Sequence, residues 1–167
     1  SGKGAAIRTG KQYVSGDIII IQDADLEYDP KDYLKILKVL TKNKYRVVYG
    51  SRVLNTKRYS NNNFTSNIRV FANHVLTIVS NLINSQNLTD AHTCYKAFDT
   101  KIFKKINLKE NGFAFCPEVT TKLSKKNYQI VELPISYNGR TYSNGKKITS
   151  FDGIIAIYCL VRYRLFD

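Results

Sequence analysis

Acidic residues are concentrated in one short segment of an otherwise strongly basic chain. Six of the 13 Asp and Glu residues fall between positions 17 and 32, although the formal net charge of the chain is +13. The centre of this segment holds Asp23, Asp25 and Glu27. Residues two apart in an extended segment point the same way, so these three carboxylates could bind one hard cation. The spacing therefore predicts a site for a metal ion and a phosphate.

The acidic residues also have a structural explanation, because carboxylates after a strand often only solvate a turn or begin the next helix. Asp29 precedes a proline, as an N-cap residue does, and Asp32 lies in the first helical turn, where it suits the helix dipole. We interpret these two residues as structural. Asp23 and Asp25 lie outside the helix, and carboxylates held close together repel one another unless a cation or proton intervenes. This favours metal binding by both, while Glu27 stays open.

Four consecutive isoleucines, residues 18–21, directly precede the acidic residues. An apolar run too short for a helix, with polar residues on both sides, is typical of a strand buried on both faces in a parallel sheet. Ligands of open α/β sheets bind outside the carboxyl ends of the strands. The carboxylates are therefore expected at the ligand-binding edge. A second strand, predicted over residues 46–49, leads into Gly50-Ser51-Arg52 and brings a cation to the same edge.

Apolar periodicity divides the rest of the chain into helices and strands. Helical spacing is clearest over residues 66–84, whose apolar stripe we interpret as core. Further helices are expected from residue 5 to 10 or 16, over 30–43, after 99–100, over 117–126 and from 149 or 150 to 165, and further strands over 94–98 and 130–135. Alternating strands and helices without repeats or a linker predict a single α/β domain.

Composition limits the classes of function. The 167 residues, 43% hydrophobic and 23% charged, are typical of one globular domain. The net charge implies an anionic partner, which could be nucleic acid, an anionic membrane surface or a phosphorylated substrate. Basic residues are spread through the chain without the interleaved aromatics of single-strand binders, so nucleic acid is not an expected partner. The competing interpretation is a non-catalytic basic module that binds nucleic acid or anionic lipid.

The last predicted helix has an apolar body and a basic, aromatic end. Its apolar residues lie between positions 151 and 161 and are followed by Arg162, Tyr163 and Arg164. Such a helix can lie in a membrane interface, where cations meet anionic lipid and tyrosines sit among the headgroups. The alternative is a helix docked on its own domain. The longest apolar stretch, 154–161, is far shorter than the ~20 residues of a spanning helix, so we predict peripheral membrane association.

Several short segments occur in an order and spacing that resemble a known family. They are Gly2–Gly10 (G-K-G-x-A-x-R-x-G), Asp23-Ala24-Asp25 (D-x-D), Gly50-Ser51-Arg52 (G-S-R), Asp90–Lys96, Pro117-Glu118, Leu133–Tyr137, and Arg140 with Gly145–Lys147. Together they resemble the nucleotide-sugar-dependent glycosyltransferases of family 2, and within them the dolichyl-phosphate mannose or glucose synthase-like group. The resemblance covers essentially the whole chain.

The chain departs from this family in two places. Thr93 and Cys94 stand where the better-known mannose synthases carry Ser-Gly, so the sugar and the acceptor are not carried over. Family members begin with a strand resembling V-I-I-P-x-Y-N-E and a second strand ending in Asp, which hold the nucleoside, and neither occurs here. The resemblance therefore implies a GT-A fold in residues 1–150, an α/β domain with a mostly parallel sheet flanked by helices but lacking its first strand-helix units. Residues 151–167 would form a C-terminal amphipathic helix, and the present chain is expected to be an inactive fragment.

The resemblance implies a metal-dependent, inverting hexosyltransferase of cell envelope biosynthesis at the cytoplasmic face of the membrane. It would move a hexose from a GDP- or UDP-hexose to a polyprenyl phosphate or a cell-surface glycan. Such a transfer must stabilise a diphosphate leaving group, which a divalent cation does as a Lewis acid. Carboxylate ligands without a Cys or His cluster favour Mg²⁺ or Mn²⁺ over zinc. Asp23, Asp25 and Glu27 are the predicted metal ligands.

The resemblance also implies which residues bind phosphate and which act in catalysis. The expected phosphate-binding cations are Lys3, Arg8, Arg52, Arg69, Arg140 and Lys147, and the expected catalytic residues are Asp25, Asp90, Glu118 and Arg140. Arginine forks suit phosphate, which favours Arg52 and Arg140, whereas Arg69 could simply be a solvated helix residue. A polyprenyl phosphate is already anionic and needs no general base. A sugar hydroxyl would need one, and Asp90 or Glu118 is the candidate.

Overall fold

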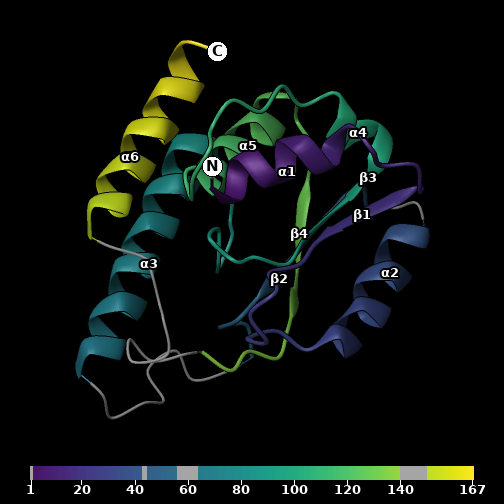
Figure 1. The fold of residues 1–167 in the computed structure, drawn as a ribbon. Coiled ribbons are helices and arrows are strands. Elements are labelled where there is room, and N and C mark those ends of the chain that lie inside the picture. The colour runs from purple at the N-terminus through teal and green to yellow at the C-terminus, as the bar shows by residue number, and fades with distance from the viewer. Residues whose placement is uncertain (1, 43–44, 56–63, 140–149) are drawn as a thin grey trace.

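A computed structural model describes residues 2–42, 45–55, 64–139 and 150–167 of the chain (Figure 1). The elements in chain order are α1 (Lys3–Lys11), β1 (Ile18–Ile21), the 3₁₀ turn η1 (Pro30–Asp32), α2 (Tyr33–Thr41), β2 (Val47–Ser51), α3 (Phe64–Asn84), β3 (Lys96–Asp99), α4 (Thr100–Lys104), α5 (Phe115–Lys125), β4 (Ile130–Pro134) and α6 (Ser150–Leu165). Every element predicted from the sequence is present, with its ends shifted by a few residues. Asp29 is the predicted N-cap, and its carboxylate accepts the N–H of Lys31.

The strands form a sheet in the order β1-β3-β2-β4. The α/β class is confirmed, but the prediction of mostly parallel pairing was wrong. Among the strands of the described residues, only β2 and β4 pair in parallel, because β3 lies antiparallel between β1 and β2. The cause is the path of residues 85–95, which bring the chain from the end of α3 back to the carboxyl end of β2. There the N–H of Gly50 donates to the carbonyl of Tyr95 at 2.7 Å, so β3 must run in the opposite direction.

β1, β2 and β4 nevertheless share one direction, since each pairing with β3 reverses it. Their carboxyl ends meet at one side of the sheet, together with the beginning of β3 (Figure 1). We call this side the carboxyl edge. The prediction that β1 is buried on both faces was wrong, because its four isoleucines are only partly buried and, within the described residues, β1 pairs with β3 alone.

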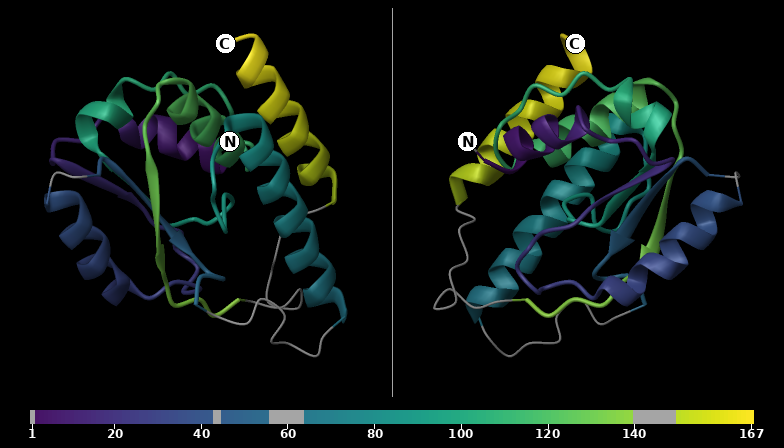
Figure 2. Two further views of the ribbon diagram at one scale, coloured as in Figure 1. Left: turned by 180° about the vertical axis from the view of Figure 1, so that it is seen from behind. Right: turned by 45° about the vertical axis from the view of Figure 1, so that its right-hand side comes forward.

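Helices cover both faces of the sheet (Figure 2). One core cluster lies between the sheet and α2, and its buried members include Ile36, Leu40, Val48 and Ala97. The other lies between the sheet, α4 and α5, and includes Phe98, Phe103, Phe115 and Leu123. α6 packs against α3 and α5 rather than against the sheet. The two cores fix the strands, and the strands in turn hold the loops of the carboxyl edge.

The first turn of α1 lies directly against residues 110–112. The N–H of Ala5 donates to the carbonyl of Asn111 at 2.9 Å. Gly4 has no room for a side chain, because a Cβ atom there would overlap the carbonyl of Glu110. Gly2 has φ 125° and packs equally closely against Asn111. These contacts set the position of Lys3 at the beginning of the helix.

Replacing Gly4 by alanine is expected to lower the free energy of unfolding by about 1–3 kcal/mol, because the added methyl group displaces residues 110–111. Gly10→Ala is the control in the same helix, where a Cβ atom meets nothing within 4 Å, and it should raise stability by up to about 1 kcal/mol through helix propensity. Urea unfolding of both variants measures the difference. Equal effects would show that the contact of Gly4 contributes nothing.

Candidate active site

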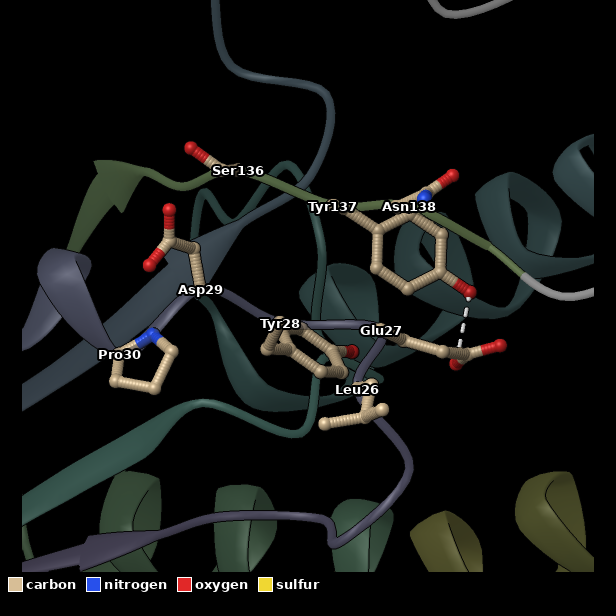
Figure 3. A pocket seen from close by; sticks show the side chains of 8 residues that line it. All are labelled: Leu26, Glu27, Tyr28, Asp29, Pro30, Ser136, Tyr137 and Asn138. Carbon is tan, nitrogen blue, oxygen red and sulfur yellow. Dashed lines mark hydrogen bonds between the residues drawn. The ribbon is translucent and has the colours of Figure 1, made fainter.

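Two pockets lie on either side of the acidic turn that follows β1. The aspartate pocket, of about 400 Å³, is lined by Lys3, Ala6, Ile7, Ile21, Gln22, Asp23, Ala24, Asp25 and Phe113. The tyrosine pocket, of about 450 Å³, is lined by Leu26, Glu27, Tyr28, Asp29, Pro30, Ser136, Tyr137 and Asn138 (Figure 3). Both pockets are at the carboxyl edge, where the sequence places the ligand site.

The acidic turn is not the extended segment that the sequence predicts. Leu26 has φ 60°, a left-handed conformation that is rare for a bulky residue, and Asp25 Oδ1 accepts the N–H of Glu27 at 3.2 Å. The chain therefore reverses at Leu26. Glu27 turns into the tyrosine pocket, where its carboxylate accepts the hydroxyl of Tyr137 at 3.2 Å (Figure 3). The structure thus brings Asp23 and Asp25 together in one pocket but separates Glu27 from them.

Asp23 and Asp25 are the two carboxylates of the aspartate pocket. Within the described part of the chain, no three Asp, Glu, His or Cys side chains are grouped to hold a metal ion. Two carboxylates are nevertheless sufficient for a cation such as Mg²⁺ when substrate phosphates supply further oxygens. The donor set of the aspartate pocket therefore fits a hard divalent cation. Lys3 lies beside it, with Nζ 2.9 Å from each carboxylate oxygen of Asp23.

Arg52 and Asp90, predicted separately as phosphate-binding and catalytic residues, form one buried ion pair. Arg52 Nε is 2.7 Å from Oδ2 and Arg52 Nη2 is 2.8 Å from Oδ1 of Asp90. The backbone N–H of Arg52 and Nδ2 of Asn73 also donate to this carboxylate, at 3.1 and 3.2 Å. Burial alone would raise the pKa of Asp90, but Arg52 and these hydrogen bonds hold it well below its ordinary value. Asp90 is therefore a structural anion in this arrangement.

Glu132 and Tyr137 extend the ion pair toward β4 and the tyrosine pocket. Glu132, on β4, accepts the N–H of Asp90 at 2.9 Å and that of Thr89 at 2.6 Å. The guanidinium of Arg52 lies 5.1 Å from the ring centre of Tyr137, whose hydroxyl contacts Glu27. The segment around Asp90 is thus connected to the acidic turn through side chains alone.

Lys96 supports the same segment from within the core. It is fully buried, and Nζ donates to the carbonyls of Ala91 and Thr93 at 3.0 and 2.7 Å, above the ring of Tyr49. Burial lowers the pKa of this ammonium. His92, between the two carbonyls, has no described partner for its buried Nε2, and burial together with Lys96 lowers its pKa to about 4. The imidazole is therefore neutral near neutral pH.

Tyrosines are the site residues that the sequence did not reveal. Tyr28 and Tyr95 stack with ring centres 4.7 Å apart. The hydroxyl of Tyr95 and that of Tyr33 both donate to Oε1 of Gln22 at 2.6 Å, which holds the residue directly after β1. The only sequence signal is position, because Tyr28, Tyr95 and Tyr137 each follow or lie within a segment singled out for other residues.

Two further predicted site residues lie away from the acidic turn and hold residues 107–111. Glu118 is fully buried, and its carboxylate accepts the N–H groups of Lys109 and Glu110 and the ammonium of Lys122. Arg8 donates to the carbonyl of Lys109 and the side chain of Asn111. The predicted residues Arg140 and Lys147 lie outside the described residues, as does the side chain of Arg69, whose backbone belongs to α3.

The sheet and its helices have a GT-A-like fold, as comparison with solved structures shows. Glucosyl-3-phosphoglycerate synthase from Mycobacterium tuberculosis in complex with Mn²⁺ and UDP-glucose superposes with a TM-score of 0.60. The complex that also contains phosphoglyceric acid superposes with a TM-score of 0.63. Both are 14% identical to the chain and cover 98% of it, while the chain covers 54% and 55% of them.

Residues 1–107 match the family described as Glycosyl transferase family 2, and the chain belongs to this family. A UDP-N-acetylglucosamine–dolichyl-phosphate N-acetylglucosaminyltransferase of Methanococcus voltae is 27% identical over 169 residues, covering 98% of the chain and 66% of the relative. A dolichyl-phosphate beta-glucosyltransferase of Trichomonas vaginalis is 26% identical over 144 residues, covering 82% and 43%. The resemblance to the dolichyl-phosphate group is thereby confirmed, although the chain spans only part of each relative.

Asp90→Asn should lower the free energy of unfolding by about 2–4 kcal/mol at pH 7, because Arg52 is left without its buried counter-ion. The folded-state pKa of Asp90 is depressed, so its contribution is present above the unfolded pKa of about 4 and is lost as the pH falls below it. Urea unfolding measures the difference in the free energy of unfolding between wild type and variant. This difference should be about 1 kcal/mol smaller at pH 3 than at pH 7. Asp29→Asn, which keeps an N-cap, is the control and should change stability little. A gap independent of pH would contradict the depressed pKa.

Proposed function

We propose that this glycosyltransferase is metal-dependent and moves a hexose from a nucleotide-diphosphate sugar to a polyprenyl phosphate, with inversion at the anomeric carbon. The observation that carries the proposal is the pair of carboxylates, Asp23 and Asp25, in one pocket at the carboxyl end of β1 beside Lys3. The Mn²⁺ and UDP-glucose of the structurally similar synthase support a cation and a nucleotide sugar. The dolichyl-phosphate transferases among the relatives support dolichyl phosphate as acceptor, and one of them supports UDP as donor nucleotide. GDP is the other candidate nucleotide.

The proposed sugar transfer requires neutralisation of phosphate charge more than it requires proton transfer. Asp23 and Asp25 would hold Mg²⁺ or Mn²⁺, which when bound acts as a Lewis acid on the diphosphate leaving group. Lys3, in the same pocket, would add a second positive charge near the phosphates. The phosphate of a polyprenyl acceptor is already ionised, so it can attack without a base.

The burial and the hydrogen bonds of the two candidate bases favour a polyprenyl phosphate over a glycan hydroxyl as the acceptor. Asp90 is fully buried and bound by Arg52, and Glu118 is fully buried and bound by Lys122. A carboxylate whose oxygens already accept several hydrogen bonds, with a depressed pKa as for Asp90, is a poor proton acceptor. An acceptor that is already anionic needs neither residue as a base.

Peripheral association with the cytoplasmic face of the membrane is the second part of the proposal. α6 is docked on the domain through Ala156, Cys159, Leu160 and Tyr163, yet its opposite side exposes Phe151, Ile154, Tyr158, Val161 and Leu165. α3, which packs against α6, exposes Phe71, Val75, Ile78 and Leu82. Within the described residues, no helix has the length and apolar content of a membrane-spanning segment. The exposed apolar side chains, with Arg162 and Arg164 nearby in sequence, support binding to an anionic interface.

Asp25→Asn should lower sugar transfer by the full-length protein about 100-fold or more, because the diphosphate loses its metal-mediated stabilisation. The assay combines Mn²⁺ or Mg²⁺, a panel of UDP- and GDP-hexoses and polyprenyl phosphate, and identifies the glycolipid by mass spectrometry. Chelation by EDTA should have the same effect as the substitution. Asp17→Asn, an exposed residue just before β1, is the control and should stay active. An Asp25 variant that binds anions slightly better and shows no lost activity would favour the basic-module interpretation.

Ile154→Asn should weaken binding to vesicles that contain anionic phosphatidylglycerol about threefold or more, because it removes an apolar contact from the interface. Ile154 is 65% exposed on α6, so the substitution should leave the fold intact. Leu34→Asn is the matched control, since Leu34 is 75% exposed on α2. Co-sedimentation at low salt measures both. Equal binding by the two variants, or wild-type protein that stays in solution, would contradict the membrane proposal.

A further inference from the structure

Lys3 lines the aspartate pocket from a backbone position that is fixed by close contacts. It is the first residue of α1, and the helix beside it is fixed to residues 110–112 by the hydrogen bond of Ala5 and by the close packing of Gly4. The side chain is only 15% exposed. Because its backbone is fixed, the ammonium can move only as far as its own side-chain torsions allow.

The ammonium of Lys3 is bound to the carboxylate of Asp23, which a metal ion would also bind. Nζ lies 2.9 Å from both Oδ1 and Oδ2 of Asp23. A lysine ammonium is ordinarily charged at neutral pH, so Lys3 and Asp23 form an ion pair.

We propose that Lys3 is a built-in counter-ion of Asp23, which makes binding of the divalent cation depend on the diphosphate of the donor. The inference rests on the proposed function and concerns the order in which that site fills. A cation that arrives alone must displace the ammonium or lie next to it, and like charges at short range in a partly buried pocket repel strongly. Metal binding without a donor is therefore disfavoured.

A diphosphate removes this conflict, because it offers the displaced ammonium new anionic partners. Lys3, Asp23 and Asp25 line one pocket, so phosphates bound to the cation would lie within reach of Lys3. The ammonium would then bind phosphate, Asp23 would be free to hold the cation, and no charge would be left without a partner. The metal and the donor are thus expected to bind as one complex.

The test compares Mn²⁺ alone with the preformed Mn²⁺–pyrophosphate complex, because pyrophosphate needs no nucleoside site. Isothermal titration of the full-length Lys3→Met variant should show Mn²⁺ alone binding about fivefold tighter than to wild type. The same variant should bind Mn²⁺–pyrophosphate about tenfold more weakly. Lys3→Arg, which keeps the charge, should restore the wild-type order. Lys104→Met, on α4 at the opposite end of β1, removes the same charge and should change neither affinity.

The opposite signs of the two effects separate this role from a structural one. A variant that weakens both ligands, or leaves the affinity for Mn²⁺ alone unchanged, overturns the counter-ion role even if Asp25→Asn still abolishes binding of Mn²⁺–pyrophosphate. Wild-type protein that binds neither ligand overturns the metal site and the proposed function with it. Should Lys3→Met not fold, as judged by circular dichroism, Lys3→Gln must show the same pair of opposite effects.

Discussion

The buried carboxylate of Asp90 determines how the segments of the carboxyl edge come together. A desolvated charge must be neutralised and hydrogen-bonded, and here the partners come from different elements. Arg52 follows β2, Asn73 belongs to α3, and Glu132 on β4 binds the backbone N–H of Asp90 itself. Satisfying the anion thus fixes the end of β2 relative to α3, and the hydrogen bond to Glu132 holds the same segment against β4. Lys96 holds the residues that follow Asp90, because its ammonium donates hydrogen bonds to two of their carbonyls.

The contacts around Asp90 extend to the acidic turn and explain its shape. Arg52 is held by Asp90 and lies over Tyr137, and the hydroxyl of Tyr137 binds Glu27. With Glu27 fixed on that side, the chain has to reverse at Leu26, whose left-handed backbone costs on the order of 1 kcal/mol or more. The turn at Leu26 places Glu27 in the tyrosine pocket and leaves two carboxylates in the aspartate pocket. The contacts around Asp90 and the metal carboxylates therefore belong to one connected structure.

Features that depend on neighbouring residues could be predicted from the sequence, and features that depend on distant contacts could not. The isoleucine strand, the Asp29 cap and the long α3 helix could be predicted, because periodicity and caps depend on neighbouring residues. The direction of β3 could not be predicted, since it depends on the path by which residues 85–95 connect α3 to the carboxyl end of β2. The orientation of Glu27 depends on one left-handed residue, and the burial of Glu118 depends on Lys122 and on backbone groups of residues 109–110. Tyr28, Tyr95 and Tyr137 carry no periodic signal and were missed for that reason.

The strongly positive net charge suggests that many cations are available to an anionic ligand, but part of this charge is used within the protein. Several cations near the carboxyl edge bind groups of the protein itself: Lys3 pairs with Asp23, Arg52 pairs with Asp90, and Lys96 donates hydrogen bonds to two carbonyls. Among the described residues that line the aspartate pocket, the charged side chains are one cation and two carboxylates. Because its one ammonium is paired with a carboxylate, such a pocket has no positive charge left to attract a diphosphate by itself. Dependence on a metal would then follow from the internal pairing of the cations, because only an added cation turns this pocket into a site for phosphate.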